Sequence, residues 1–165
     1  RYEYSNLGVG LLGHVLARRA GKSYEALLRE RVLEPLGMKD TAIVLDERLR
    51  GRLKAGHGPG LNEVPGWDLP TLAGAGALRS TVNDLLKFLD ANLDPSRVKS
   101  TLGKALADAQ KTHRVAKTEP REPEMGLGWH MIILPERPKI LWHNGGTGGY
   151  RSWLGIAPGK KEGSR

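Results

Sequence analysis

Cysteine is absent from this 165-residue chain, which excludes both a disulfide framework and a thiolate metal site. The sequence also lacks an apolar run of about 18 residues, the length that a membrane-crossing helix requires. The five histidines show no metal-ligand spacing, and neither a P-loop nor a Gly-x-Ser-x-Gly nucleophile motif occurs. We therefore expect no metal, no cofactor and no transmembrane segment.

Acidic residues are in deficit, with 18 Asp and Glu against 26 Lys and Arg, and the net charge is +8. Such a surplus is typical of proteins that bind nucleic acids. Here the basic residues are dispersed, and most stand beside acids or near the ends of predicted helices, where cations are also favoured. This distribution favours a solvated basic surface, and we expect no nucleic-acid partner.

The first three quarters of the chain have the periodicity of helices. Apolar spacing predicts helices over 6–20, 24–37, 82–93 and 97–110, with long loops between 51 and 79. Ser23, Thr81 with Asp84, and Ser96 are the expected caps at helix starts, and Gly21 is an expected stop. The first helix places a set of large apolar residues on one face: Leu7, Leu11, Leu12, Val15 and Leu16. Its three glycines predict close backbone packing against a neighbouring element.

After Met125 the pattern changes to short segments rich in aromatic and β-branched residues. "GLGWHMIIL" (126–134), "KILWH" (139–143) and "YRSWLGIAP" (150–158) predict adjacent antiparallel strands. The order of elements predicts an α+β fold, with a helical lobe over 1–124 and strands over 125–165. Three short strands with an open edge rarely make a self-sufficient sheet, so we expect 1–165 to be part of a single domain.

Three places carry candidate chemistry. Tyr4-Ser5-Asn6 either caps the first helix or presents a phenol and an amide for proton transfer and orientation. In "LWHNGGTGGY" (141–150), His143 is either structural or catalytic, and the glycines after it allow backbone N–H groups to approach a ligand or an oxyanion. Ser96 and Lys99 have Ser-x-x-Lys spacing, but helix capping is the favoured interpretation for this serine.

Taken together, the segments 2–41, 73–90 and 126–158 resemble the serine β-lactamase and penicillin-binding-protein superfamily. They are most similar to its class C-like branch of carboxypeptidases, aminopeptidases and esterases, and the matching segments occur in that family's order. The resemblance implies an incomplete β-lactamase/transpeptidase-like fold. It also implies hydrolysis of an amide or ester in a small-molecule or peptide substrate, through an acyl-enzyme.

The resemblance also implies a role for each matching residue. Tyr4 takes the place of the general base of a Tyr-x-Asn motif, and Asn6 that of the asparagine that orients the substrate. His143, Asn144 and Gly145 match the family's Lys-Thr-Gly motif, and the Gly146 N–H matches an oxyanion-hole donor. A histidine in place of lysine is only partly charged near neutrality, which favours a peptidase or esterase over a β-lactam hydrolase.

The family's nucleophile lies on a Ser-x-x-Lys helix that precedes Tyr-x-Asn. Ser96 and Lys99 follow Tyr4, so we expect no nucleophile in this chain and no acyl transfer by the chain alone. The family's closing strands and C-terminal helix are also missing from the matched segments. A periplasmic or secreted parent enzyme is implied by the resemblance. The alternative is a non-catalytic module of the same fold that binds a peptide or other ligand without turnover.

Overall fold

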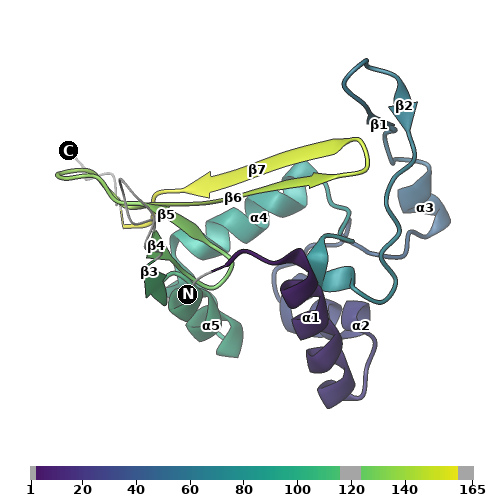
Figure 1. Cartoon of the computed structure of the whole chain (residues 1–165). Helices are drawn as coiled ribbons and strands as arrows, with labels where there is room; N and C mark the ends of the chain where they lie inside the picture. Colours follow the sequence, from purple (N-terminus) through teal and green to yellow (C-terminus); the bar gives the residue numbers. More distant parts are fainter. Residues whose placement is uncertain (1–2, 116–123, 160–165) are drawn as a thin grey trace. The chain divides into compact units, whose positions relative to one another are not determined.

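The computed structural model describes residues 3–115 and 124–159 (Figure 1). The chain divides into two compact units. The helix unit comprises residues 4–85 and 145–152, and the sheet unit comprises residues 1–3, 86–144 and 153–165. Helix α4 and strands β6 and β7 contribute residues to both units, and each unit has its own packing.

The helix unit begins with α1 (Asn6–Ala20), α2 (Tyr24–Leu28) and the π-helical turn η1 (Arg29–Leu33). It continues through α3 (Glu47–Arg50), a hairpin of β1 (Gly56–His57) and β2 (Glu63–Val64), and the 3₁₀ turn η2 (Ala73–Ala75). Helix α4 (Val82–Leu93) starts in this unit. The expected loops of 51–79 are therefore confirmed, apart from the two-residue strands and the 3₁₀ turn.

The sheet unit contains η3 (Pro95–Arg97) and α5 (Thr101–Ala109), and its strands follow. They are β3 (Arg114–Val115), β4 (Glu124–Met125), β5 (His130–Ile132), β6 (Ile140–Thr147) and β7 (Tyr150–Ile156), hydrogen-bonded in that order. The antiparallel pairing of the two segments around His130 and Trp142 is confirmed. The short strands β3 and β4 were not expected within 113–125, and part of that stretch, 116–123, lies outside the described residues.

Helix α1 packs through its small residues. Ser5 caps it by accepting a bond from the Gly8 N–H at 2.9 Å, and Gly21 ends it in the left-handed conformation, with φ +62°. Gly10, Gly13 and Ala17 are the buried residues of the helix. A Cβ at Gly10 would lie 2.9 Å from the Leu72 Cβ, and one at Gly74 would lie 3.0 Å from the Val9 carbonyl oxygen. The predicted close backbone packing is confirmed, with η2 as the partner.

The large apolar face of α1 is exposed in this structure. Its predicted members Leu7, Leu11, Leu12, Val15 and Leu16 are all between 46% and 66% exposed. Periodicity correctly grouped these side chains but did not identify the packed side of the helix. The reason is steric, because η2 approaches the α1 backbone so closely that only glycine and alanine fit between them.

Of the three other predicted helix N-caps, two are confirmed and one is wrong. Ser23 accepts from the Ala26 N–H, and Thr81 Oγ1 accepts from the Asp84 N–H at 3.3 Å. The buried Asp84 carboxylate instead accepts from the Asp40 N–H and the Thr41 hydroxyl.

The prediction for Ser96 is wrong. This serine lies in η3 and bonds Asp94, whereas Ser100 caps α5. Proline at position 95 and the Asp94 side chain favour a separate turn before the helix.

The core of the sheet unit lies where the strands meet the helical residues of the same unit. Trp129, Met131, Leu141 and Ile156 are buried together, and Phe88, Leu89 and Ala109 pack against them. Leu141 has no exposed surface, and its partner across the β5–β6 pair is Met131. Strand β6 is thus anchored by hydrophobic burial at its first residues, directly before Trp142 and His143.

Replacing Gly10 with alanine tests the packing of α1 on η2. Alanine improves helix propensity by about 1 kcal/mol, but its Cβ would press on Leu72, so we expect a net loss of about 1–2 kcal/mol in the free energy of unfolding. Urea denaturation measures it. Gly8→Ala is the control, because Gly8 is exposed and its added Cβ would meet only the Ser5 side chain, at 3.3 Å. Equal stability of the two variants would contradict the packing.

Candidate active site

The residues predicted for the site are distributed over both units. Tyr4, Asn6, Gly145 and Gly146 belong to the helix unit, whereas His143 and Asn144 belong to the sheet unit. Strand β6 carries the last four of these residues in one continuous stretch. The meeting of Tyr4 with His143 in one site therefore stays a prediction, and the geometry of each unit is described separately.

At the start of α1, the capping role and the candidate chemistry belong to different residues. Ser5 has the extended backbone of an N-cap and its hydroxyl accepts the Gly8 N–H. The capping interpretation is confirmed for Ser5 and does not involve the side chains of its two neighbours. Tyr4 is 56% exposed, and Asn6 is the exposed first residue of the helix. A phenol and an amide thus lie on either side of the cap, on a rigid helix start.

The four glycines of "NGGTGG" serve two different purposes. Strand β6 continues to Thr147, and the chain reverses at Gly148 and Gly149, with Gly149 at φ +73°. A Cβ at Gly148 would lie 2.5 Å from the Pro65 carbonyl oxygen, and one at Gly149 would lie 2.5 Å from the His57 nitrogen. The His57 N–H donates to the Gly149 carbonyl at 2.9 Å. These two glycines are required because the turn packs directly on the chain's own backbone.

Gly145 and Gly146 have different surroundings. A Cβ at Gly145 would meet the Ser152 Oγ at 2.8 Å, and one at Gly146 would overlap the Arg151 guanidinium, whose Cζ would be 3.3 Å away. The atoms nearest to these two added carbons, outside the adjacent residues, are side-chain atoms of β7. Gly146 is exposed. Rotatable side chains therefore lie nearest to these two glycines, and such side chains can move aside for a ligand.

Arg151 is a functional candidate that sequence reasoning missed. Its guanidinium lies beside Gly146, and its side chain is exposed. Within residues 3–115 and 124–159, no hydrogen bond or ion pair engages it. The sequence spacing could have identified Arg151. Gly146 and Arg151 are equally far from the two-residue turn, one on each strand, and such positions face each other in a hairpin.

His143 has an aromatic neighbourhood in the sheet unit. The His130 ring on β5 stacks on Trp142 with centroids 4.6 Å apart, and it lies 5.3 Å from the His143 ring at a tilt of 33°. Burial lowers the pKa of His130, and the charge of a protonated His143 lowers it further. Two imidazoles therefore stand next to each other at the start of the glycine stretch.

Metal chemistry finds no support in the described residues, since no group of three or more His, Cys, Asp or Glu side chains is suited to hold an ion. Across the same part of the chain, no helix has the length and apolar content that crossing a bilayer requires.

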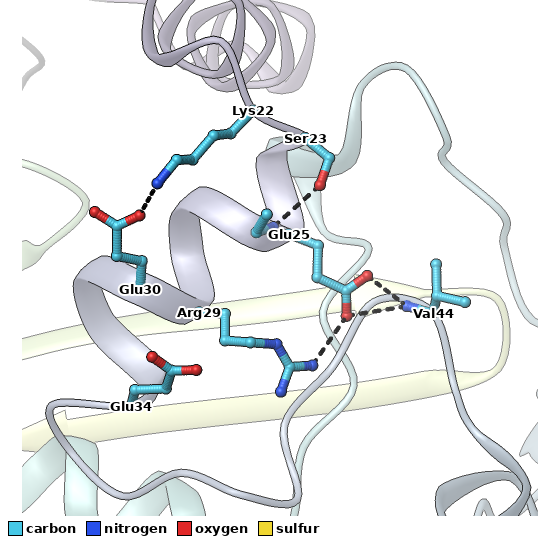
Figure 2. Close-up of a pocket in the computed structure, with 8 residues that line it drawn as sticks. Lys22, Ser23, Glu25, Arg29, Glu30, Glu34 and Val44 are labelled. Atoms are coloured by element: carbon cyan, nitrogen blue, oxygen red, sulfur yellow. Dashed lines mark hydrogen bonds and ion pairs between the residues drawn. The ribbon is translucent and has the colours of Figure 1, made fainter.

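A shallow charged hollow lies beside α2 and η1, as Figure 2 shows. Two of its acids, Glu25 and Glu30, have partners. The Glu25 carboxylate accepts from the Ile43 N–H at 2.8 Å and the Val44 N–H at 3.1 Å, and Glu30 pairs with Lys22. None of the predicted site residues lines this hollow. The Glu25 carboxylate ties the loop after Thr41 to α2, and we assign the hollow a structural role.

Comparison with known proteins gives a match over almost the whole chain. Residues 1–163 match the family described as Beta-lactamase. The chain is 29% identical over 175 residues to the D-alanyl-D-alanine-carboxypeptidase/endopeptidase AmpH of Escherichia coli (strain K12), with 98% of this chain and 43% of that protein covered.

Two further relatives show the same degree of similarity. The chain is 29% identical over 168 residues to penicillin-binding protein 4 of Amycolatopsis lactamdurans, with coverage of 94% and 44%. It is also 29% identical over 147 residues to a beta-lactamase of Pseudomonas fluorescens, with coverage of 87% and 39%. The chain therefore spans less than half the length of these relatives.

Two alanine substitutions test whether the turn glycines are more closely packed than the strand glycines. Gly149→Ala places a side chain at a left-handed residue and against the His57 backbone, so we expect a loss of about 3 kcal/mol in the free energy of unfolding. Gly145→Ala meets only the rotatable Ser152 hydroxyl, and we expect a change of about 1 kcal/mol or less. Urea denaturation of both variants compares them. A Gly149→Ala variant as stable as Gly145→Ala would show that the turn is not closely packed.

Proposed function

This chain belongs to the beta-lactamase family, and from that premise we propose that it is part of a serine acyl hydrolase. The substrate is an amide or an ester, and the reaction passes through an acyl-enzyme. The observation that supports this proposal best is the Gly145–Gly146 backbone, which follows His143 on β6 in the family-matched region and lies beside the rotatable Ser152 and Arg151 side chains. A strand with such a surface is suited to lie along a substrate.

Each candidate residue has a chemical role in this proposal. The Gly146 N–H donates a hydrogen bond to the oxyanion that forms as the carbonyl is attacked, because Gly146 is exposed and a strand N–H is already oriented before the reaction. Tyr4 acts as the general base, and Asn6, one residue past the cap, orients the substrate amide. His143, Asn144 and Gly145 line the substrate. The attacking serine comes from outside this chain.

Ser96 is not a candidate for that nucleophile. Its hydroxyl donates to the Asp94 carboxylate within η3, and Lys99 lies beyond the end of that turn. The two residues are not on one helix, so they lack the regular geometry by which a lysine amine one turn away activates a serine.

The charge of the strand pair bears on the substrate class. His143 replaces a residue that is lysine in true β-lactamases, whereas Arg151 beside Gly146 keeps its charge at every physiological pH. We propose that Arg151 receives an anionic group of the substrate, with the guanidinium moving off the glycine as the substrate arrives. This arrangement is suited to amide or ester substrates that have a carboxylate near the scissile bond.

The role of Tyr4 is tested by Tyr4→Phe in the full-length protein that contains this chain. Loss of the phenol removes the general base, so we expect the rate of hydrolysis to fall about 100-fold or more. A fluorophosphonate or a fluorescent penicillin should label one serine in the unsubstituted protein. Absence of label would contradict the hydrolase. Labelling with an unchanged rate in Tyr4→Phe would remove the tyrosine from the mechanism, and ligand binding without turnover would favour the non-catalytic module.

The role of Arg151 is tested by comparing Arg151→Gln with Arg151→Lys on a substrate with a free carboxylate and on its amide. Loss of a charge-assisted contact worth about 1.5–3 kcal/mol should raise KM for the carboxylate substrate roughly 10- to 100-fold in Arg151→Gln, with kcat little changed. The lysine variant should retain part of the effect, and the amide substrate should not respond. Equal effects on both substrates would contradict anion recognition.

A further inference from the structure

We propose that Arg79 is a positioning residue, which holds the turn after β6 in place through the loop around Trp67. Every residue of this connection belongs to the helix unit. Its consequence for catalysis rests on the proposed function, since only there does the Gly146 N–H bind an oxyanion. The connection itself rests on hydrogen bonds and backbone contacts within the unit.

The Arg79 guanidinium bonds three backbone carbonyl oxygens, two of them far from it in the sequence. Its Nη1 donates to the Ile43 carbonyl at 2.8 Å and to the Ala77 carbonyl at 3.4 Å, and its Nη2 donates to the Trp67 carbonyl at 3.1 Å. In the described ranges 3–115 and 124–159, no carboxylate pairs with this arginine. A guanidinium carries five N–H donors in a rigid plane, so one side chain can join several backbone segments in a fixed geometry.

Arg79 is itself held by its backbone. Its N–H donates to the Ala42 carbonyl at 2.9 Å, and the Ala42 N–H donates to the Arg79 carbonyl at 3.0 Å. Ala42 is buried. Ile43 is fixed on both sides, because its N–H donates to the Glu25 carboxylate on α2 and its carbonyl accepts from Arg79. The guanidinium therefore has a firm base, from which it fixes the Trp67 carbonyl relative to α2.

The loop that Arg79 holds lies against the turn after β6. A Cβ added at Gly148 would be 2.5 Å from the Pro65 carbonyl oxygen, 2.8 Å from Trp67 Cδ1 and 3.0 Å from the Trp67 nitrogen. The loop and the turn are thus in direct backbone contact. The residue that contacts the turn through its nitrogen is the one that bonds Arg79 through its carbonyl. A movement of Trp67 would therefore move the surface on which the turn rests.

The turn sets the position of the candidate oxyanion donor. Gly148 is two residues after Gly146, about 7 Å along an extended strand. Neither glycine has a side chain that could anchor it. The contact at Trp67, together with the bond from the His57 N–H to the Gly149 carbonyl, locates this end of β6. An oxyanion donor must be in place before the reaction, and a shift of about 1 Å at such a group can cost roughly 100-fold in rate.

Arg48 provides a matched control in the same unit. Its guanidinium also bonds a backbone carbonyl, that of Lys39, at 3.2 Å, and it pairs with Asp40. Lysine at either position keeps the positive charge but loses the planar set of donors that reaches several acceptors. Both substitutions therefore weaken a connection within the helix unit, and only Arg79→Lys releases the loop that contacts the turn.

The test compares Arg79→Lys with Arg48→Lys in the full-length protein that contains this chain. In Arg79→Lys we expect kcat and kcat/KM to fall together by about 10-fold, because the oxyanion exists only once the carbonyl is attacked. The NMR amide signals of Gly148 and Trp67 should move in the same variant. Arg48→Lys should alter neither the rates nor these two signals.

An unmoved Gly148 signal in Arg79→Lys overturns the proposal whatever the rate, and so does an equal fall in kcat in both variants. If Arg79→Lys does not fold, the guanidinium signals of the unsubstituted protein decide. Three carbonyl bonds should keep the Arg79 Nη–H signals separate, whereas those of exposed Arg151 should average and serve as the internal reference. Averaged signals for Arg79 would contradict the connection.

The outcome for Arg79 is separate from the outcome for the enzyme. A full-length protein that labels no serine contradicts the hydrolase. In that protein, movement of the Gly148 signal in Arg79→Lys still supports the connection, and an unmoved signal overturns it. A labelled serine with unchanged rates in Arg79→Lys would support the hydrolase and contradict the positioning role.

Discussion

The contact between the Gly148–Gly149 turn and the loop around Gly56 and His57 determines the form of the candidate strand. Backbone meets backbone there, and the His57 N–H bonds the Gly149 carbonyl. This contact lies within the helix unit and holds the tip of the hairpin that carries Gly145 and Gly146. The positions of Gly145 and Gly146 therefore do not depend on contacts made by side chains of their own. The proposed oxyanion donor, the Gly146 N–H, lies close to this anchored turn, and a preorganised donor requires such an anchor.

Local features of the fold were predictable because their causes are local. The caps at Ser23 and Thr81 and the stop at Gly21 depend on hydrogen bonds within a few residues. The packed side of α1 was not predictable, because it is decided by η2, about sixty residues away in the sequence. The start of α5 was misplaced because two serines four residues apart are both suitable caps, and the turn at Pro95 decides between them.

The residues of the candidate site also fall into those that were predictable from local sequence and those that were not. The positions of Tyr4, Asn6, His143 and Gly146 came from motif order, which one sequence can carry. Arg151 and His130 were missed because their relation to the motif is across strands, and hairpin or sheet register must be known first. Both residues lie next to the motif, since the Arg151 guanidinium is beside Gly146 and the His130 ring is 5.3 Å from that of His143. A motif identifies the family, whereas the residues across the strand pair adjust the site to a substrate.

The claim that all these roles share is that the phenol before α1 and the imidazole on β6 serve one substrate. The most direct measurement is a nuclear Overhauser experiment on the chain, with the His130–His143 contact within the sheet unit as the positive reference. We predict one cross-peak between the Tyr4 ring and a bound substrate analogue, and a second between the His143 ring and the same analogue. A clear His130–His143 cross-peak without either of these signals would contradict a shared site.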